Sequence, residues 1–322
     1  MLSVFTDSFF APWMWWTFFG LVIIAIVVDL WVVNQGPAHK VSVKEALTWS
    51  VIWIALSFAF NGFLWWYLDG TVGREIANEK SMEFFTGYLI EKSLAVYNIF
   101  VFLMIFTYFA VPVEFQRRVL IIGVVGAIVL RAMMILIGAW LIARFHWVLY
   151  VFGAFLLFTG IKMWWAHGKE TDLGDNPVLK WMKSHMKISA KFDGEKFFTM
   201  ENGVRIATPL LIVVVMIAIT DIVFAVDSIP AIFAITDDAF IVLTSNIFAI
   251  LGLRAMYFLL ADMAERFHLL TYGLAMILIF IGRKMLLIDI FKIPVFISLG
   301  VVALILVGTV VASLMTKPKS AG

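Results

Sequence analysis

Cysteine is absent from the 322 residues, and charged side chains make up only 14% of them. The lack of thiols excludes disulfides, thiolate metal sites and cysteine nucleophiles. The five histidines are scattered and form no HExxH-type pair, which argues against a zinc enzyme. The formal net charge of only +2 indicates no nucleic-acid partner.

Hydrophobic residues, at 63%, are more than a soluble domain of this size can bury. This composition excludes a soluble enzyme and a disordered chain, and it predicts an integral membrane protein in a lipid bilayer. A helix that crosses a bilayer needs about 20 mostly apolar residues. Nine segments meet this need, so we expect an all-α membrane protein with nine transmembrane helices: Pro12–Val33, Val43–Leu68, Glu83–Phe109, Val119–Leu141, Trp147–Trp165, Ile206–Ile235, Ala239–Leu260, Leu269–Ile288 and Ile293–Met315.

The charges between these segments predict the orientation, because Lys and Arg gather on the cytoplasmic side of a membrane. With the N-terminus outside, the cytoplasmic side holds fourteen of them: Lys40, Lys44, Arg117, Arg118, Lys169, Lys180, Lys183, Lys187, Lys191, Lys196, Arg205, Arg266, Lys317 and Lys319. The other side holds four: Arg74, Lys80, Arg144 and Lys292. We therefore predict an outside N-terminus and a cytoplasmic C-terminus.

One long polar segment, 166–205, separates the fifth span from the sixth and places apolar residues such as Trp181 and Met182 among lysines. It is interpreted either as a solvated cytoplasmic linker or as an amphipathic segment that faces lipid. The chain then divides into peripheral helices (1–82), a first three-helix unit (83–166), this linker (167–205), a second three-helix unit (206–288) and a ninth helix with its tail (289–322).

The two three-helix units carry matching landmarks in the same order. The octapeptide that begins at Glu91 aligns with the one that begins at Asp221, and both contain Ala-Val at the same offset. Further along, Leu-Arg-Ala-Met occurs at 130–133 and again at 253–256, and Gly160-Ile-Lys-Met aligns with Gly282-Arg-Lys-Met. An odd number of spans per unit predicts two inverted three-helix repeats, which are typical of transporters that bind substrate at the repeat interface.

Carboxylates inside these spans are the main candidates for function, because an ionisable group there costs about 3 kcal/mol. Glu91, Asp221 and Asp227 lie on the first span of each repeat, with Asn98 and Ser228 nearby. Such oxygen ligands suit hard divalent cations. The alternative is a structural network that only holds the helices together.

The spacing of two of these acids requires a break in their helix. Residues six apart, such as Asp221 and Asp227, differ by about 120° around an ideal helix and about 9 Å along it. Pro230 supplies a cause for an unwound or kinked segment that turns both inward. On the second spans, Arg131 and Arg254 are repeat mates that we interpret either as charge partners of the acids in the absence of a cation or as a structural ion pair.

Four stretches give the chain a clear resemblance to the TerC family of integral membrane proteins, most closely to its Alx-like members. They begin at Gly87, Phe152, Phe224 and Thr244 and read GYLIEKSLAV, FGAFLLFTGIK, FAVDSIPAIFAIT and TSNIFAILGLRAMYF. The resemblance spans about Val43 to Met315. It implies export of manganese(II) as substrate from the cytoplasm across a bacterial inner membrane, with no cofactor and no enzymatic reaction, and a link to tellurium resistance.

Two positions depart from the family pattern. Tyr97 stands where the family usually has Asp, and Ala218 stands where it usually has Glu. The resemblance carries Glu91, Asn98, Asp221, Asp227 and Ser228 over as metal ligands, and the two missing carboxylates predict weakened divalent binding. An alternative from another functional class is an assembly or metallation partner for other membrane proteins, without transport activity.

Overall fold

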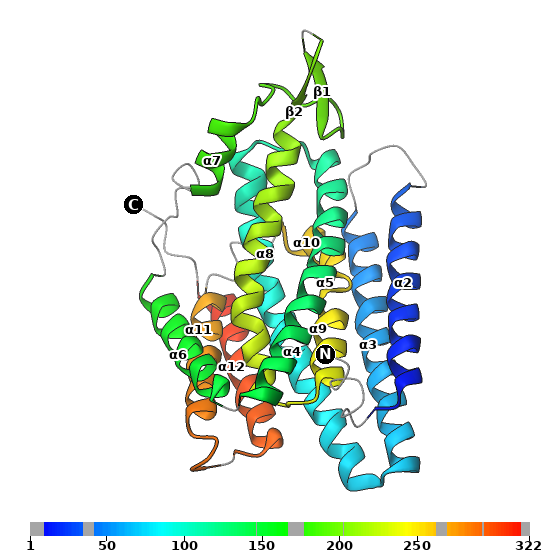
Figure 1. The fold of residues 1–322 in the computed structure, drawn as a ribbon, viewed down its shortest axis with the longest axis vertical. Coiled ribbons are helices and arrows are strands. Elements are labelled where there is room, and N and C mark those ends of the chain that lie inside the picture. Colours follow the sequence, from blue (N-terminus) through cyan, green and yellow to red (C-terminus); the bar gives the residue numbers. More distant parts are fainter. Residues whose placement is uncertain are drawn as a thin grey trace.

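The chain folds into a bundle of helices with one short β-hairpin at its end (Figure 1). The computed structural model describes residues 10–34, 42–145, 147–166, 177–201, 203–261, 269–291 and 293–316, with the backbone alone for 29–34 and 97. The elements are α2 (Pro12–Asn34), α3 (Val43–Thr71), α4 (Arg74–Tyr108), α5 (Val113–Arg144), α6 (Val148–Ala166), α7 (Pro177–His185), β1 (Phe198–Glu201), β2 (Val204–Ala207), α8 (Pro209–Phe233), α9 (Ala239–Ile250), α10 (Leu253–Leu260), α11 (Leu270–Leu286) and α12 (Val295–Met315).

All nine predicted segments contain a helix, but fewer of them meet the length and hydropathy of a membrane span. In the described part of the chain, α3, α4, α5, α6, α8 and α12 do so, and α9 with α10 makes a seventh if the pair is one bent span. α2 is apolar over a shorter described stretch, and α11 has only 17 residues. The protein is therefore a multi-pass helical membrane protein.

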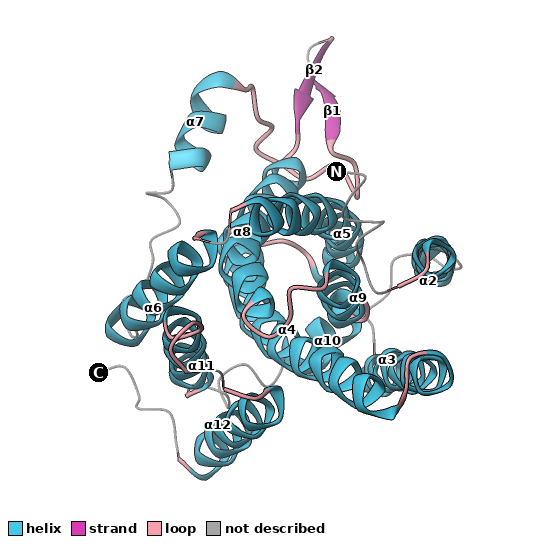
Figure 2. Cartoon of the chain, turned by 60° about the horizontal axis from the view of Figure 1, so that its bottom comes forward, coloured by secondary structure: helices cyan, strands magenta, loops and turns pink. Residues whose placement is uncertain are grey.

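Four helices enclose the centre of the bundle. Seen from its end, α4, α5, α8 and α9 surround a common axis, α2 and α3 lie on one side, and α6, α11 and α12 lie on the other (Figure 2). α4 packs on α9 and α8, and α5 packs on α8. The described core is continuous through this group and includes Phe84, Ile232, Phe240 and Phe248.

The expected break near Pro230 is wrong, because α8 is one α-helix from Pro209 to Phe233 with Pro230 inside it. The break occurs instead in the next span, where α9 and α10 meet at an angle of 41°. Gly252, the residue just before α10, has a φ of +83°, which a glycine adopts at little cost. A Cβ on this residue would lie 2.7 Å from the Trp53 ring, so the bend also fits closely against α3.

α6 and α11 approach each other closely at three glycines. A Cβ on Gly282 would lie 2.6 Å from the Leu157 nitrogen, and one on Gly160 would lie 2.9 Å from the Ala275 oxygen. A Cβ on Gly153 would likewise lie 3.1 Å from the Gly282 oxygen. Small residues permit this backbone contact, which holds α6 and α11 together as a pair.

The segment between α6 and α8 folds onto the bundle over its described residues, 177–201 and 203–205. Leu179 and Met182 of α7 are buried in the core next to α8, whereas Trp181 is exposed. Strands β1 and β2 form an antiparallel hairpin that extends past the helix ends (Figure 1). Hydrogen bonds from Lys196 and Thr199 lower the pKa of the Asp193 carboxyl below its usual value.

Candidate functional site

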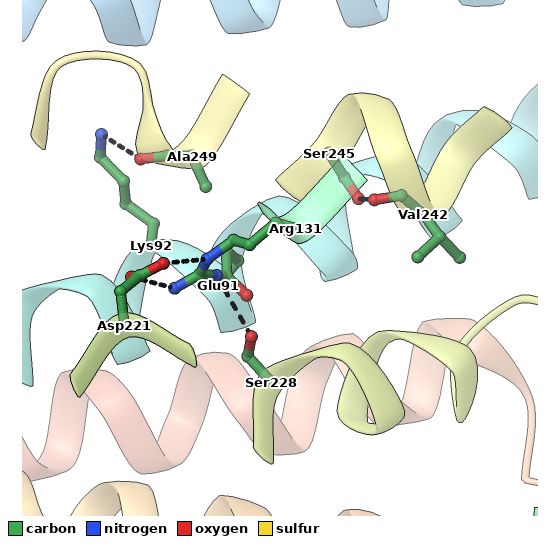
Figure 3. A network of polar contacts seen from close by, with 8 residues as sticks. All are labelled: Glu91, Lys92, Arg131, Asp221, Ser228, Val242, Ser245 and Ala249. Carbon is green, nitrogen blue, oxygen red and sulfur yellow. Dashed lines mark hydrogen bonds and ion pairs between the residues drawn. The ribbon is translucent and has the colours of Figure 1, made fainter. Parts of the chain in front are cut away.

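A cluster of charged side chains lies at the centre of the bundle, where α4, α5 and α8 meet (Figure 3). Arg131 of α5 donates from Nη2 to Asp221 Oδ1 at 2.9 Å and from Nε to Asp221 Oδ2 at 3.3 Å. Its Nη1 bonds Glu91 Oε1 of α4 and Ser228 Oγ of α8, the latter at 3.2 Å. One planar guanidinium thus joins the two helices that carry the acids.

The cluster has almost no contact with solvent. Arg131 is 1% exposed, Glu91 0% and Asp221 3%. Glu91 Oε2 has no hydrogen-bond partner among the described residues. Two carboxylates therefore share one guanidinium, and a buried charge of this kind costs several kcal/mol unless it is paired. With both acids ionised, the two carboxylates carry one more unit of charge than the guanidinium neutralises.

A second cation links this cluster to the break between α9 and α10. Lys92, next to Glu91 on α4, donates from Nζ to the Ala249 oxygen at 3.1 Å and lies 3.5 Å from the Leu251 oxygen (Figure 3). The last carbonyl groups of a helix lack internal partners and carry partial negative charge. The ammonium of Lys92 therefore stabilises the C-terminal end of α9 within the bundle.

Asp227 and Asn98 lie apart from this cluster. With Thr159, Lys162 and hydrophobic neighbours they line a cavity of about 220 Å³ between α4, α6 and α8. The unbroken α8 explains the separation, because it keeps Asp221 and Asp227 on different faces. In the described part of the chain, no three Asp, Glu, His or Cys side chains converge closely enough to hold a metal ion.

The remaining predicted residues have separate places. Ala218 is half-buried on α8, one helical turn before Asp221. Arg254 is buried at the start of α10 and lines a small cavity with Trp53 and Leu251. The side chain of Tyr97 lies outside the described residues.

Two features of this region did not emerge from the sequence as site residues. Lys92 is charged and lies inside a predicted span, which could have drawn attention to it, but its partners are backbone atoms exposed by a break. Glu83 and Lys284 line a further cavity at one end of the bundle. Both were predicted at the ends of spans, where a charged side chain usually reaches solvent.

The fold and the buried cluster define a multi-pass helical membrane protein with ionisable groups fixed at its centre. Residues 76–321 match the integral membrane protein TerC family, and the chain belongs to that family. The relatives named "Putative membrane-bound redox modulator Alx" are 55% identical in Escherichia coli (strain K12), over 92% of this chain and 93% of theirs, and 56% identical in Salmonella typhi, over 93% of each. An uncharacterised membrane protein of Myxococcus xanthus is 46% identical over 95% of this chain and 93% of its own. No solved structure matches the chain.

Proposed function

We propose that this protein is a secondary transporter that exports manganese(II) from the cytoplasm, with Glu91 and Asp221 as the central cation ligands. The observation that carries the proposal is the buried cluster in which one guanidinium faces two carboxylates. A site that must bind and release a dication needs negative charge and a means of neutralising it between cycles. Arg131 supplies that means, because it already occupies the space between the two acids.

Arg131 and the cation then compete for the same oxygens. A bound dication would satisfy both carboxylates and displace the guanidinium toward Ser228 or another acceptor. After release, the return of Arg131 removes the cost of leaving two charges buried. Protons could take its place in part, so export coupled to proton entry is consistent with the same chemistry.

Packing on both sides of the cluster supports alternating access. Toward the end remote from the hairpin, a Cβ on Gly87 would lie 3.2 Å from Ile232 Cγ2, and one on Gly138 would lie 3.0 Å from the Phe233 ring. Toward the hairpin end, Phe106 packs edge-on against Tyr257 at 5.5 Å. Both layers are buried, so the cluster is closed from either side in this state.

Contacts between α6 and α11 support inverted repeats. The alignment of Gly160 with Gly282 also aligns Gly153 with Ala275 and Leu157 with Ile279. Gly160 lies against Ala275 and Ile279, and Gly282 lies against Gly153 and Leu157. These contacts are reciprocal, as a two-fold axis between the repeats requires. We infer rocking of one repeat against the other, nine spans in a bacterial inner membrane, and the N-terminus outside.

The cavity between α4, α6 and α8 gives Asp227 and Asn98 a role next to the central site rather than within it. Both line the space beside α6 that Lys162 also faces. We assign them to the path of the cation, and Ser228 to the central cluster. Ala218 removes a carboxylate one turn from Asp221, and Tyr97 removes another, so transport is expected to be weaker than in a relative with both acids.

Cellular manganese tests this proposal. Cells that express the protein should accumulate less manganese than cells with the empty vector, and Asp221→Asn should abolish the difference at equal expression. Tyr97→Asp with Ala218→Glu should increase export. Unchanged manganese with both the native chain and the double variant would reject transport of this ion.

An assembly or metallation partner is the alternative, and the folded segment before α8 favours it. Trp181 of α7 and Phe198 and Met200 of the hairpin are exposed hydrophobic side chains outside the bundle. Replacement of Trp181, Phe198 and Met200 by serine should weaken a partner role and leave transport largely intact. The relatives' name suggests redox modulation. A chain without cysteine cannot carry out a thiol-based form of it. No enzymatic reaction or cofactor is proposed.

A further inference from the structure

The cavity lined by Glu83 and Lys284 lies at the end of the bundle remote from the hairpin. It has a volume of about 450 Å³. Residues at or near the ends of α4, α5, α8, α11 and α12 line it. Three of its lining residues are acids, Glu79 and Glu83 of α4 and Asp237 of the turn before α9, and one is a lysine, Lys284 of α11. Negative charge therefore predominates around a space large enough for a small hydrated ion.

Lys284 is unusual among these residues because it is buried without a direct counter-ion. It is 8% exposed, yet in the described part of the chain no carboxylate oxygen lies within 4 Å of its Nζ. Glu83, whose charge acts on Lys284 through space, is instead bonded by Lys80 at 2.8 Å. The ammonium of a lysine is carried on a flexible chain of four carbons, so it can move within the cavity toward an acid.

We propose that this cavity binds a hydrated divalent cation between Glu79, Glu83 and Asp237, and that Lys284 is a tethered cation that takes its place when the ion leaves. The acids do not converge closely enough for direct coordination by three of them. A cation that keeps its water shell does not need such convergence, and six waters occupy about 180 Å³ at about 30 Å³ each. The cavity accommodates this volume.

The position of the cavity fits a station on the cation path. Glu83, Gly87 and Glu91 follow one another along α4 at intervals of four residues, so the central cluster lies about 12 Å farther along the same helix. Ile232 and Phe233 are buried in this interval, where they pack against Gly87 and Gly138. Once its ammonium has moved to the acids, Lys284 would hinder the entry of an external cation. The identity of the ion and the direction of its movement rest on the proposed function, whereas the binding site does not.

Manganese(II) binding to a protein without the central charges tests the site separately from transport. Glu91→Met, Arg131→Met and Asp221→Leu together replace the cluster by apolar residues, so no buried charge is left without its partner. In this triple variant, in detergent, the loss of the free Mn²⁺ signal in electron paramagnetic resonance should report binding. Asp237→Asn is a suitable change because this acid is exposed, and it should weaken binding roughly tenfold.

Lys284→Gln in the same triple variant should tighten Mn²⁺ binding roughly tenfold, because it removes a competing charge from the cavity. Glu75→Gln is the matched control, since Glu75 lies one turn before Glu79 on α4 but does not line the cavity. It should leave binding within about twofold. Mn²⁺ that stays free at millimolar concentration, or binding that Asp237→Asn does not weaken, would overturn the site. Unchanged or weaker binding in Lys284→Gln would overturn the role of the lysine.

Discussion

Arg131→Met is the most informative single change in the central cluster. Methionine is flexible and apolar and fills much of the space of the arginine side chain, so packing is largely kept. The change removes every hydrogen bond that the guanidinium donates to Glu91, Asp221 and Ser228. What remains is a pair of carboxylates that are 0% and 3% exposed and have lost their common partner.

Removal of one partner from a buried ion pair costs about 3–5 kcal/mol, because the other charge stays uncompensated. At about 2–4 °C per kcal/mol, we expect Arg131→Met to lower the melting temperature in detergent by roughly 6–20 °C. The triple apolar variant Glu91→Met/Arg131→Met/Asp221→Leu should recover most of this loss, because it leaves no buried charge. Intrinsic tryptophan fluorescence during heating measures both, since the chain has 13 tryptophans.

The comparison of these variants separates charge from packing. If Arg131→Met melts within about 2 °C of the native protein, the guanidinium does not hold the two carboxylates, and our account of the cluster is wrong. If the triple variant melts lower than Arg131→Met, the loss comes from packing and not from unpaired charge. The melting temperature of Arg131→Lys should lie between those of the native protein and Arg131→Met. An ammonium keeps the charge but cannot form the two parallel hydrogen bonds with Asp221.

Two further predictions concern helix contacts. Gly282→Ala should lower stability by about 1–3 kcal/mol, because the new Cβ meets the Leu157 backbone nitrogen at 2.6 Å. Gly126→Ala on α5, with nothing within 4 Å, is the control and should not lower stability in the same thermal assay. Lys92→Met should cost about 1–3 kcal/mol, because it leaves the Ala249 carbonyl at the end of α9 without its donor; increased hydrogen exchange at 249–253 would confirm the cause, and unchanged exchange would refute it.

The helices of the bundle could be predicted from the sequence because each lies within a long apolar run. Each of the nine predicted segments contains a helix, and the ends differ by a few residues, except that α4 begins at Arg74 and not at Glu83, and α5 at Val113 and not at Val119. The small segment before α8 was harder to interpret. Its lysines favour solvent, but Leu179 and Met182 are spaced to bury one side of a short helix, and they do so.

The candidate site could be predicted only in part. Charges inside spans identified Glu91, Asp221 and Arg131, and the repeat placed them on neighbouring helices. The division between the Asp221 cluster and the Asp227 cavity could not be foreseen, because it depends on whether α8 breaks. Pro230 lies close to the end of α8, where the loss of one backbone hydrogen bond leaves the helix intact.

The bend between α9 and α10 depends on tertiary packing. A single glycine within an apolar segment is compatible with a straight helix, and the sequence around Gly252 contains no proline. The bend is defined by Trp53 from α3 and by the ammonium of Lys92 from α4. Both come from helices far away in the sequence, so the local pattern does not indicate them.

Manganese flux through the purified protein in liposomes tests the central claim most directly. Vesicles that enclose a manganese-sensitive dye should show Mn²⁺ entry with the native chain. The flux should fall more than about tenfold in Glu91→Gln and in Asp221→Asn, because each removes a proposed ligand of the ion. Equal flux in the native protein and in both variants would contradict a transport role for the buried cluster.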